Sequence, residues 1–230
     1  DSVKEDWTGA WRDPRPFNPI GAKPENALTG TLHTVGGFRN DPLVVSSKFS
    51  RLPFWRNTEV ASLAEGQSVT LGRGVLGTEW DEDVDNGARP AGLTRLSETT
   101  VDNVAYIQDL GNTYDSGTAT HSLTLYRAPS GATVFSAGTA QWAWGLDDLH
   151  TYYVAPGRVR PDPFGAVKAL QQATVNLLAD MGVKPKALQS NLVATDVTQN
   201  SVGTLASAAP STLPALPAPP RVIAANQVTR

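Results

Sequence analysis

Alternating apolar and polar residues in the middle of the chain predict β-strands. In the segment "HSLTLYRA", Leu123 and Leu125 face one side and their polar neighbours face the other, which is the two-residue period of a strand. A Pro-Ser-Gly turn follows and leads into "ATVFSAGTAQWAW", so we expect the two segments to form a hairpin. The segments "LVVSSKF" and "SVTLGRGVLGTEW" predict two more strands, the second with glycines that indicate a bend.

Apolar residues at helical spacing predict one long helix over residues 162–181. Asp162 is suited to cap its start and Pro163 to occupy its first turn. Gly182 is suited to end the helix, and Pro185 prevents it from resuming. The single apolar stripe of this helix indicates that it covers a sheet.

These elements predict a mixed α/β fold, and composition divides the chain into three parts. Residues 1–42 are rich in turn-forming residues and predict an irregular arm that wraps the domain, anchored by Trp7 and Trp11. Residues 43–190 are expected to form the domain itself, a twisted sheet with antiparallel hairpins covered by the C-terminal helix. Residues 191–230 are rich in alanine and proline and almost uncharged, which predicts an extended linker or tail.

Composition narrows the classes of partner and location. The chain has 230 residues, a net charge of −3 and no basic block, so nucleic acid and anionic membranes are poor partners. No apolar run approaches the ~20 residues of a membrane span. The absence of cysteine excludes thiol catalysis and disulfides. It fits a secreted or cell-surface bacterial protein, with a cytoplasmic one as the alternative, and the start at Asp1 indicates a processed chain or a piece of a longer one.

The densest group of charged residues lies in "GTEWDEDVDNGARPAG", residues 77–92. Asp81, Asp83 and Asp85 occupy alternate positions, as in the start of an EF-hand loop. The sixth position of that loop must be glycine and is Asn86 here, so an EF-hand is excluded. A different calcium site on the three aspartates stays open. The simpler interpretation is a solvated turn whose acidic side chains pair with arginines.

Glu79, in the same stretch, is a candidate catalytic carboxylate. It follows a glycine-interrupted strand, the kind of position where α/β folds present side chains to a cleft. Trp80 beside it would exclude water and contact a substrate, which favours general acid or base work by Glu79. Asp81 is the second catalytic candidate in this stretch.

A second candidate group lies in "QWAWGLDDLH". On a strand, Trp142 and Trp144 would face the same side, with Asp147 just beyond them. This arrangement fits a cleft in which Trp142 and Asp147 bind substrate. It fits equally a strand whose tryptophans pack under the terminal helix, with Asp147 in a turn, and we favour packing.

Three blocks in this order resemble one known family. They are "LGTEWDEDVDNGARPAGLTRLSETT", "GATVFSAGTAQWAWGLDD" and "QQATVNLLADMGVKPKALQSNLV". Together with the opening segment they resemble the C-terminal domain of the N,N-dimethylformamidase large (beta) subunit-like family, of the multidomain bacterial type. The resemblance covers roughly residues 6–195. It implies an amidotransferase-like α/β region and hydrolysis of an amide C–N bond at a mononuclear iron held by two tyrosines and one glutamate.

The resemblance transfers to this chain only in part. Glu79 resembles a glutamate that lies near the iron, and Trp142 matches a tryptophan on the strand that ends the domain. The iron ligands are expected upstream of this chain, because none of its tyrosines matches their motif: Tyr106, Tyr114, Tyr126, Tyr152 and Tyr153.

Two functions follow as hypotheses. In the first, the chain is the C-terminal portion of a dimethylformamidase-like hydrolase that contributes Glu79 and Asp81, while the upstream part of the polypeptide or a separate chain supplies the metal ligands. In the second, it is a non-catalytic structural or ligand-binding module of a large secreted or surface protein, stabilised by calcium. A homo-oligomer is compatible with either.

Overall fold

The computed structural model describes residues 11–16, 18, 21–37, 39–108, 113–150, 160–161 and 165–195. The elements in chain order are α1 (Asn26–Thr29), β1 (Leu32–Gly36), β2 (Asn40–Ser46), η1 (Ser47–Phe49), η2 (Pro53–Trp55), η3 (Glu59–Ser62), β3 (Ser68–Gly77), β4 (Trp80–Glu82), β5 (Thr94–Arg95), β6 (Thr99–Gln108), β7 (Thr113–His121), β8 (Thr124–Arg127), β9 (Thr133–Ser136), η5 (Trp142–Gly145), β10 (Leu149–His150), β11 (Arg160–Pro161) and α2 (Lys168–Asp180).

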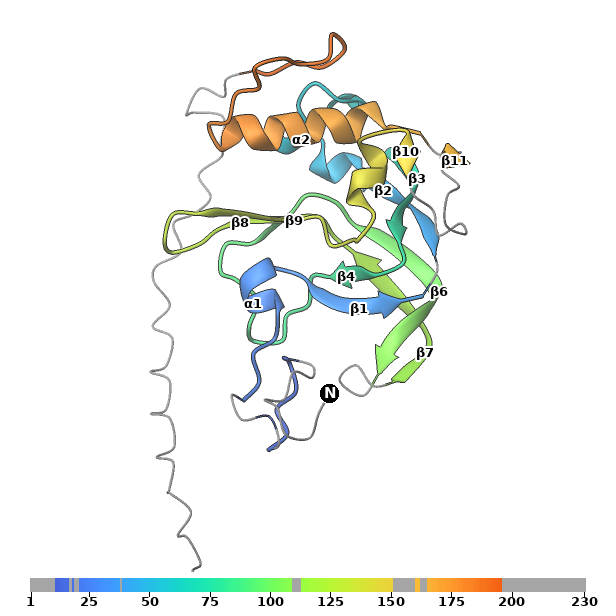
Figure 1. Cartoon of the computed structure of the whole chain (residues 1–230), viewed down its shortest axis with the longest axis vertical. Coiled ribbons are helices and arrows are strands. Elements are labelled where there is room, and N and C mark those ends of the chain that lie inside the picture. Colours follow the sequence, from blue (N-terminus) through green and yellow to red (C-terminus); the bar gives the residue numbers. More distant parts are fainter. Residues whose placement is uncertain are drawn as a thin grey trace, which may run out of the picture.

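The described part of the chain has mixed content but is mostly antiparallel sheet (Figure 1). Strands β1, β4, β7 and β6 close into a small barrel in that order, and β2 pairs with β3. Strands β5, β8 and β9 form a third sheet, and β10 pairs with β11. All of these pairs are antiparallel. The strands form several small sheets and not the one twisted sheet that the sequence predicts.

The hairpin expected after Leu123 is confirmed. Strands β8 and β9 pair antiparallel, with Leu125 opposite Phe135. The strands expected at "LVVSSKF" and "SVTLGRGVLG" are confirmed as β2 and β3, with register shifts near Pro42. Proline has no N–H for the ladder, which accounts for the irregularity at that position.

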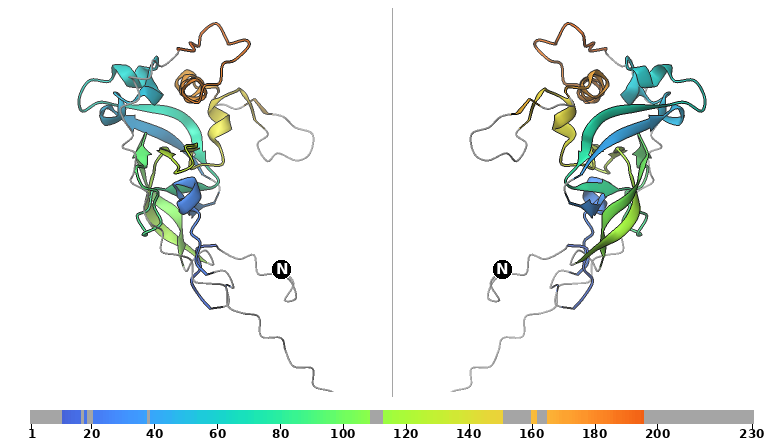
Figure 2. Two further views of the ribbon diagram at one scale, coloured as in Figure 1. Left: turned by 90° about the vertical axis from the view of Figure 1, so that its left-hand side faces the viewer. Right: turned by 90° about the vertical axis from the view of Figure 1, so that its right-hand side faces the viewer.

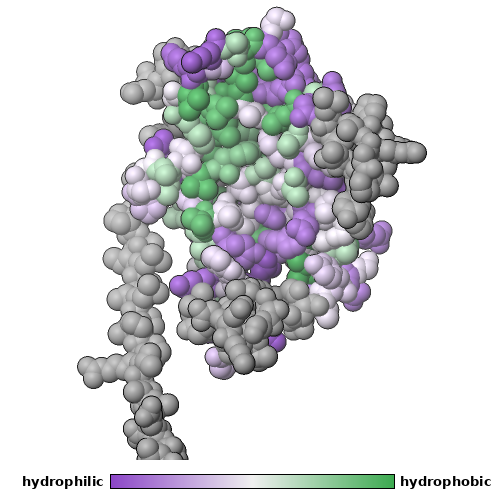
Figure 3. Space-filling view, in the orientation of Figure 1, coloured by the Kyte–Doolittle hydropathy of each residue, from purple (hydrophilic) through white to green (hydrophobic). Residues whose placement is uncertain are grey.

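The core lies between the barrel and α2. Its largest fully buried side chains include Trp55 and Trp80. Helix α2 contributes a narrow buried face that includes Leu170, and Gly145 of η5 lets the two elements approach, because a Cβ there would lie 2.4 Å from Leu170 Cδ1. Figure 2 shows α2 end-on beside η5 and the β2–β3 pair. Hydrophobic residues also gather on the face seen in Figure 3, over α2 and the β8–β9 hairpin.

The helix begins later than the sequence predicts. Residues 162–164, with the expected cap and first turn, lie outside the described residues. Gly165 has a φ of 56°, in the left-handed region, and the helix starts only at Lys168. The expected end is confirmed: Gly182 has a φ of 81°, and its N–H and that of Val183 close the last turn.

The prediction of an irregular arm over residues 1–42 is wrong for the second half of that range. Residues 26–36 form α1 and β1, and β2 begins before residue 42. Strand β1 was missed because its pairing with β4 shifts between His33 and Val35, and this bulge breaks the two-residue alternation that identifies a strand. Trp11 is 63% exposed, while Trp7 lies outside the described residues, as do residues 196–230 of the expected tail.

The strand expected at Trp142 and Trp144 is also wrong. Residues Trp142–Gly145 form the short helix η5, so the two rings do not share one side of a strand. Trp142 packs edge-on against Phe135, with ring centroids 5.8 Å apart. In the residues that the structure describes, no helix has the length and apolar content to cross a membrane.

Candidate functional site

A strained kink between β3 and β4 positions the candidate carboxylates. Thr78 has a φ of 56°, a left-handed conformation that β-branched residues rarely adopt. Gly77 before it has no room for a side chain, because a Cβ would lie 1.4 Å from Gln141 Oε1. Gln141 Nε2 in turn donates to Thr78 Oγ1 at 3.2 Å. Backbone strain of this kind persists only where the surroundings enforce it, and it is often found at functional sites.

After the kink, strand alternation separates Glu79 and Asp81 from Trp80. Glu79 and Asp81 line one pocket, whereas Trp80 on the opposite side is fully buried in the core. The Trp80 ring lies edge-on to that of His121, with centroids 5.9 Å apart. The structure therefore corrects the expectation that Trp80 contacts a substrate and shields Glu79, whose side chain is exposed.

The pocket has a volume of about 540 Å³. Its walls come from α1, β1, the kink, and the chain that leaves β9; they include Leu28, His33, Glu79, Asp81 and residues 134–140. Polar and apolar side chains therefore both line the pocket. Such mixed lining is typical of sites for small organic ligands.

Asp81 is held in place from three directions. Its Oδ1 lies 3.7 Å from Nδ1 of His33, the residue opposite it on β1. Its Oδ2 accepts a hydrogen bond of 2.7 Å from Thr31 Oγ1, and that hydroxyl lies 2.7 Å from Ser136 Oγ. Its backbone N–H donates to Gly138 O at 2.8 Å. The carboxylate is therefore fixed in orientation.

Histidine and carboxylate stabilise each other's charge in this pair. The Asp81 carboxylate raises the pKa of His33, against the opposing effect of burial. Burial would raise the pKa of Asp81, but its contacts with His33 and Thr31 outweigh burial and hold that pKa below its usual range. The pair thus favours a protonated imidazole beside an ionised carboxylate.

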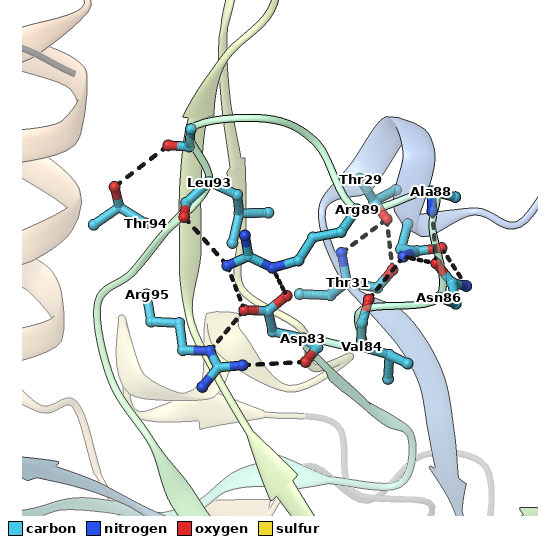
Figure 4. Close-up of polar contacts among 12 residues, drawn as sticks. Thr29, Thr31, Asp83, Val84, Asn86, Ala88, Arg89, Leu93, Thr94 and Arg95 are labelled. Carbon is cyan, nitrogen blue, oxygen red and sulfur yellow. Dashed lines mark hydrogen bonds and ion pairs between the residues drawn. The ribbon is translucent and has the colours of Figure 1, made fainter. Parts of the chain in front are cut away.

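Asp83 is the centre of a separate cluster, in which the side chains of Arg89 and Arg95 meet its carboxylate (Figure 4). Its side chain is 1% exposed and accepts hydrogen bonds from Arg89 at 2.6 and 2.8 Å and from Arg95 at 2.6 Å. Burial would raise the pKa of Asp83, but the two guanidinium groups outweigh it and lower that pKa. The arginine pairing that the sequence left as the simpler interpretation is therefore present.

The structure does not bring Asp81, Asp83 and Asp85 together as a calcium site. Asp81 faces the pocket, Asp83 binds two arginines, and Asp85 is exposed. Across the described ranges, no group of three or more His, Cys, Asp or Glu side chains is placed to hold a metal. Strand β4 ends at Glu82, so its alternation does not continue to Asp83 and Asp85, and two arginines already neutralise the charge of Asp83.

Replacing Asp83 by asparagine is expected to lower the free energy of unfolding by about 2 kcal/mol, because the charge-assisted bonds to both arginines are lost. The half-exposed arginines keep the effect below that of a fully buried pair. Urea unfolding measures it. Asp85→Asn, in the same loop but exposed, is the matched control and should change stability by less than about 0.5 kcal/mol. Equal effects of the two changes would contradict the role of Asp83.

The described residues do not fit the iron site that the resemblance implies. Tyr106 donates a hydrogen bond of 2.9 Å to Glu82 Oε2, and burial and this glutamate raise the pKa of Tyr106 to about 12, which keeps it a neutral phenol. The hydroxyl of Tyr126 donates to Leu28 O at 2.6 Å. The remaining tyrosines are Tyr114, which is exposed, and Tyr152 and Tyr153, which lie outside the described residues.

The pocket contains two of the residues predicted from the sequence and several that were not predicted. Glu79 and Asp81 line the pocket as a pair, but Trp142 and Asp147 are not among its lining residues. Three polar residues of the pocket region were missed: Thr31, His33 and Ser136. Only the β1–β4 register and the end of β9 bring them to Asp81, and no local motif marks that pairing.

Comparison with known proteins gives one match. The model of a family described as "N,N-dimethylformamidase beta subunit-like, C-terminal" matches residues 1–154. No curated protein and no solved structure matches the chain. The matched range includes the whole of the kink, the β1–β4 pair and the pocket, and it ends before α2.

Proposed function

Since the chain belongs to the N,N-dimethylformamidase beta subunit-like C-terminal family, we propose that it forms the C-terminal part of an amide hydrolase that cleaves a C–N bond. The observation that carries this proposal is the pocket in which Glu79, Asp81 and His33 lie together. Amide hydrolysis requires proton transfer to and from the reacting groups, and carboxylates and imidazoles are the side chains best suited to it near neutral pH.

In this proposal Glu79 is the general base. Its carboxylate is exposed and lines the pocket, where it can accept a proton from a water molecule that attacks the substrate. The strained backbone of Thr78 supports this role, because it sets the direction of the chain at Glu79, between β3 and β4. Leu28 and Phe135, which also line the pocket, are suited to contact alkyl groups of a small amide.

The chain is proposed to act together with other sequence. The described strands are antiparallel, so we place the amidotransferase-like α/β region expected from the resemblance in the upstream part of the polypeptide or in a separate chain. The metal ligands, which the described tyrosines do not supply, are placed there too. The pocket would then lie where the two parts meet.

Glu79→Gln tests the proposal in the protein that carries this chain and its upstream part. The amide side chain keeps the size of Glu79 but cannot accept the proton, so kcat on a small N-alkyl amide is expected to fall about 10²–10⁴-fold. Glu65→Gln is the matched control: Glu65 is also exposed and does not line the pocket, so kcat should not change. An unchanged kcat in Glu79→Gln removes the role of this residue. It favours the alternative in which this chain is a non-catalytic module of the protein.

A further inference from the structure

His33 and Asp81 meet in the pocket from neighbouring strands. Nδ1 of His33 faces Oδ1 of Asp81 at 3.7 Å, which leaves Nε2, at the far end of the ring, for a ligand. This spacing is slightly longer than a hydrogen bond, and pairs of this kind shorten when a substrate is bound. We propose that His33 is the general acid of this pocket and that Asp81 is its positioning residue, an inference that rests on the proposed hydrolysis of an amide.

The contacts of Asp81 explain why it can position the ring. Thr31 has one hydroxyl proton and donates it to Asp81 Oδ2, so the hydroxyl of Ser136 donates to Thr31 in turn. Ser136 Oγ also accepts a hydrogen bond of 3.2 Å from the N–H of Gly138. This chain of bonds ties Asp81 to the end of β9 and leaves Oδ1 directed at His33.

The charged groups around His33 favour an acid over a base. Asp81 on β4 and Glu79 before it favour the protonated imidazole, and Arg12, which donates to the backbone oxygen of His33 at 2.7 Å, opposes it. The carboxylates outweigh the arginine and burial, so the pKa of His33 lies above 6.5. More of the imidazole therefore carries a proton at neutral pH than in an isolated histidine.

The proposed reaction conserves atoms and protons. Hydrolysis adds one water and breaks one C–N bond. The water oxygen forms the new C–O bond, and Glu79 takes the proton that this oxygen loses. As the C–N bond breaks, its electron pair stays on nitrogen and Nε2 of His33 donates a proton to it, so that the amine leaves neutral. Solvent returns the proton from Glu79 to His33, which restores both residues.

The general-acid role is tested with two substrates that share an acyl group. An alkyl amide needs a proton on its leaving nitrogen, whereas a p-nitrophenyl ester releases a stable anion and needs none. In the protein with its upstream part, His33→Gln is expected to lower kcat on the amide about 10²–10⁴-fold and to affect the ester much less. Circular dichroism checks that the variant is folded. Equal losses on both substrates would overturn the acid role, since a merely structural defect affects both.

The role of Asp81 is tested by NMR titration of the His33 imidazole in this chain, which requires no turnover. The wild type is expected to titrate above pH 6.5, and Asp81→Asn is expected to shift the midpoint downward. The alkaline limb of the kcat profile on the amide should shift in the same direction. An unchanged midpoint overturns the positioning role alone. Absence of amide hydrolysis by the wild type overturns the proposed function and with it the acid role, while the titration still decides the His33–Asp81 pair.

Discussion

Lowering the pH from about 7 to about 4 is expected to remove about 3 kcal/mol from the free energy of unfolding through His121 alone. His121 is fully buried, and burial lowers its pKa from 6.5 to about 4. In the unfolded chain His121 takes up a proton near pH 6.5, and in the folded chain it does so only near pH 4. Stability contributed by the neutral imidazole is therefore present above pH 6.5 and is lost as the pH falls through this window.

The local contacts of His121 explain why its charged form is disfavoured. Nε2 lies 2.9 Å from Ala137 O, but Nδ1 has no hydrogen-bond partner in the described structure. A second proton on the ring would place an unpaired donor in the core. The Asp81 carboxylate opposes this effect, yet burial outweighs it.

Urea unfolding at several pH values, in the wild type and in His121→Gln, measures this contribution. The variant should be less dependent on pH between about 4 and 6.5, because glutamine does not titrate. His33→Gln is the opposing control: the raised pKa of His33 adds stability at low pH, which is lost as pH rises, so its removal should steepen the acid loss. Carboxylates with lowered pKa, such as Asp83, act below this window. Identical pH profiles of wild type and His121→Gln would contradict the prediction.

Local sequence patterns predicted the elements that depend on local signals. The β8–β9 hairpin and the end of α2 follow from alternation, a turn and Gly182, all within a few neighbouring residues. The predicted start of α2 at Asp162 was wrong. Asp162 and Pro163 together are a strong helix-start signal in the sequence, but the left-handed backbone at Gly165 interrupts the helix, and α2 begins only at Lys168.

The candidate site depends on pairing between distant strands, which one sequence does not encode locally. Glu79 was proposed because it follows a recognisable strand and resembles a family glutamate, and Asp81 because it stands in the same acidic stretch. Their alternation with Trp80 already indicated that Trp80 faces the other way, and this signal was overlooked. His33 could not be found, because its place beside Asp81 results from the β1–β4 register and the bulge within it.

Asn176→Leu is expected to lower the free energy of unfolding by about 2–4 kcal/mol, because it leaves one buried and one partly buried carbonyl group without this donor. Asn176 on α2 is fully buried, and its Nδ2 donates to Phe54 O at 2.9 Å and to Arg56 O at 2.7 Å. Its Oδ1 accepts from Gln172 Nε2 at 2.9 Å. Leucine fills a similar volume, so the loss reports the hydrogen bonds and not a cavity. Urea unfolding measures the change.

The same substitution at Asn191 is the matched control. Asn191 is exposed, so Asn191→Leu should change stability by less than about 0.5 kcal/mol. Asn176 also connects α2 to the pocket, because Phe54 stacks on Phe135 with ring centroids 5.5 Å apart, and Phe135 lines the pocket wall. Loss of the donor at residue 176 should therefore weaken both the attachment of α2 and the packing behind the site. A loss below about 1 kcal/mol would contradict the role of the Asn176 side chain in holding α2.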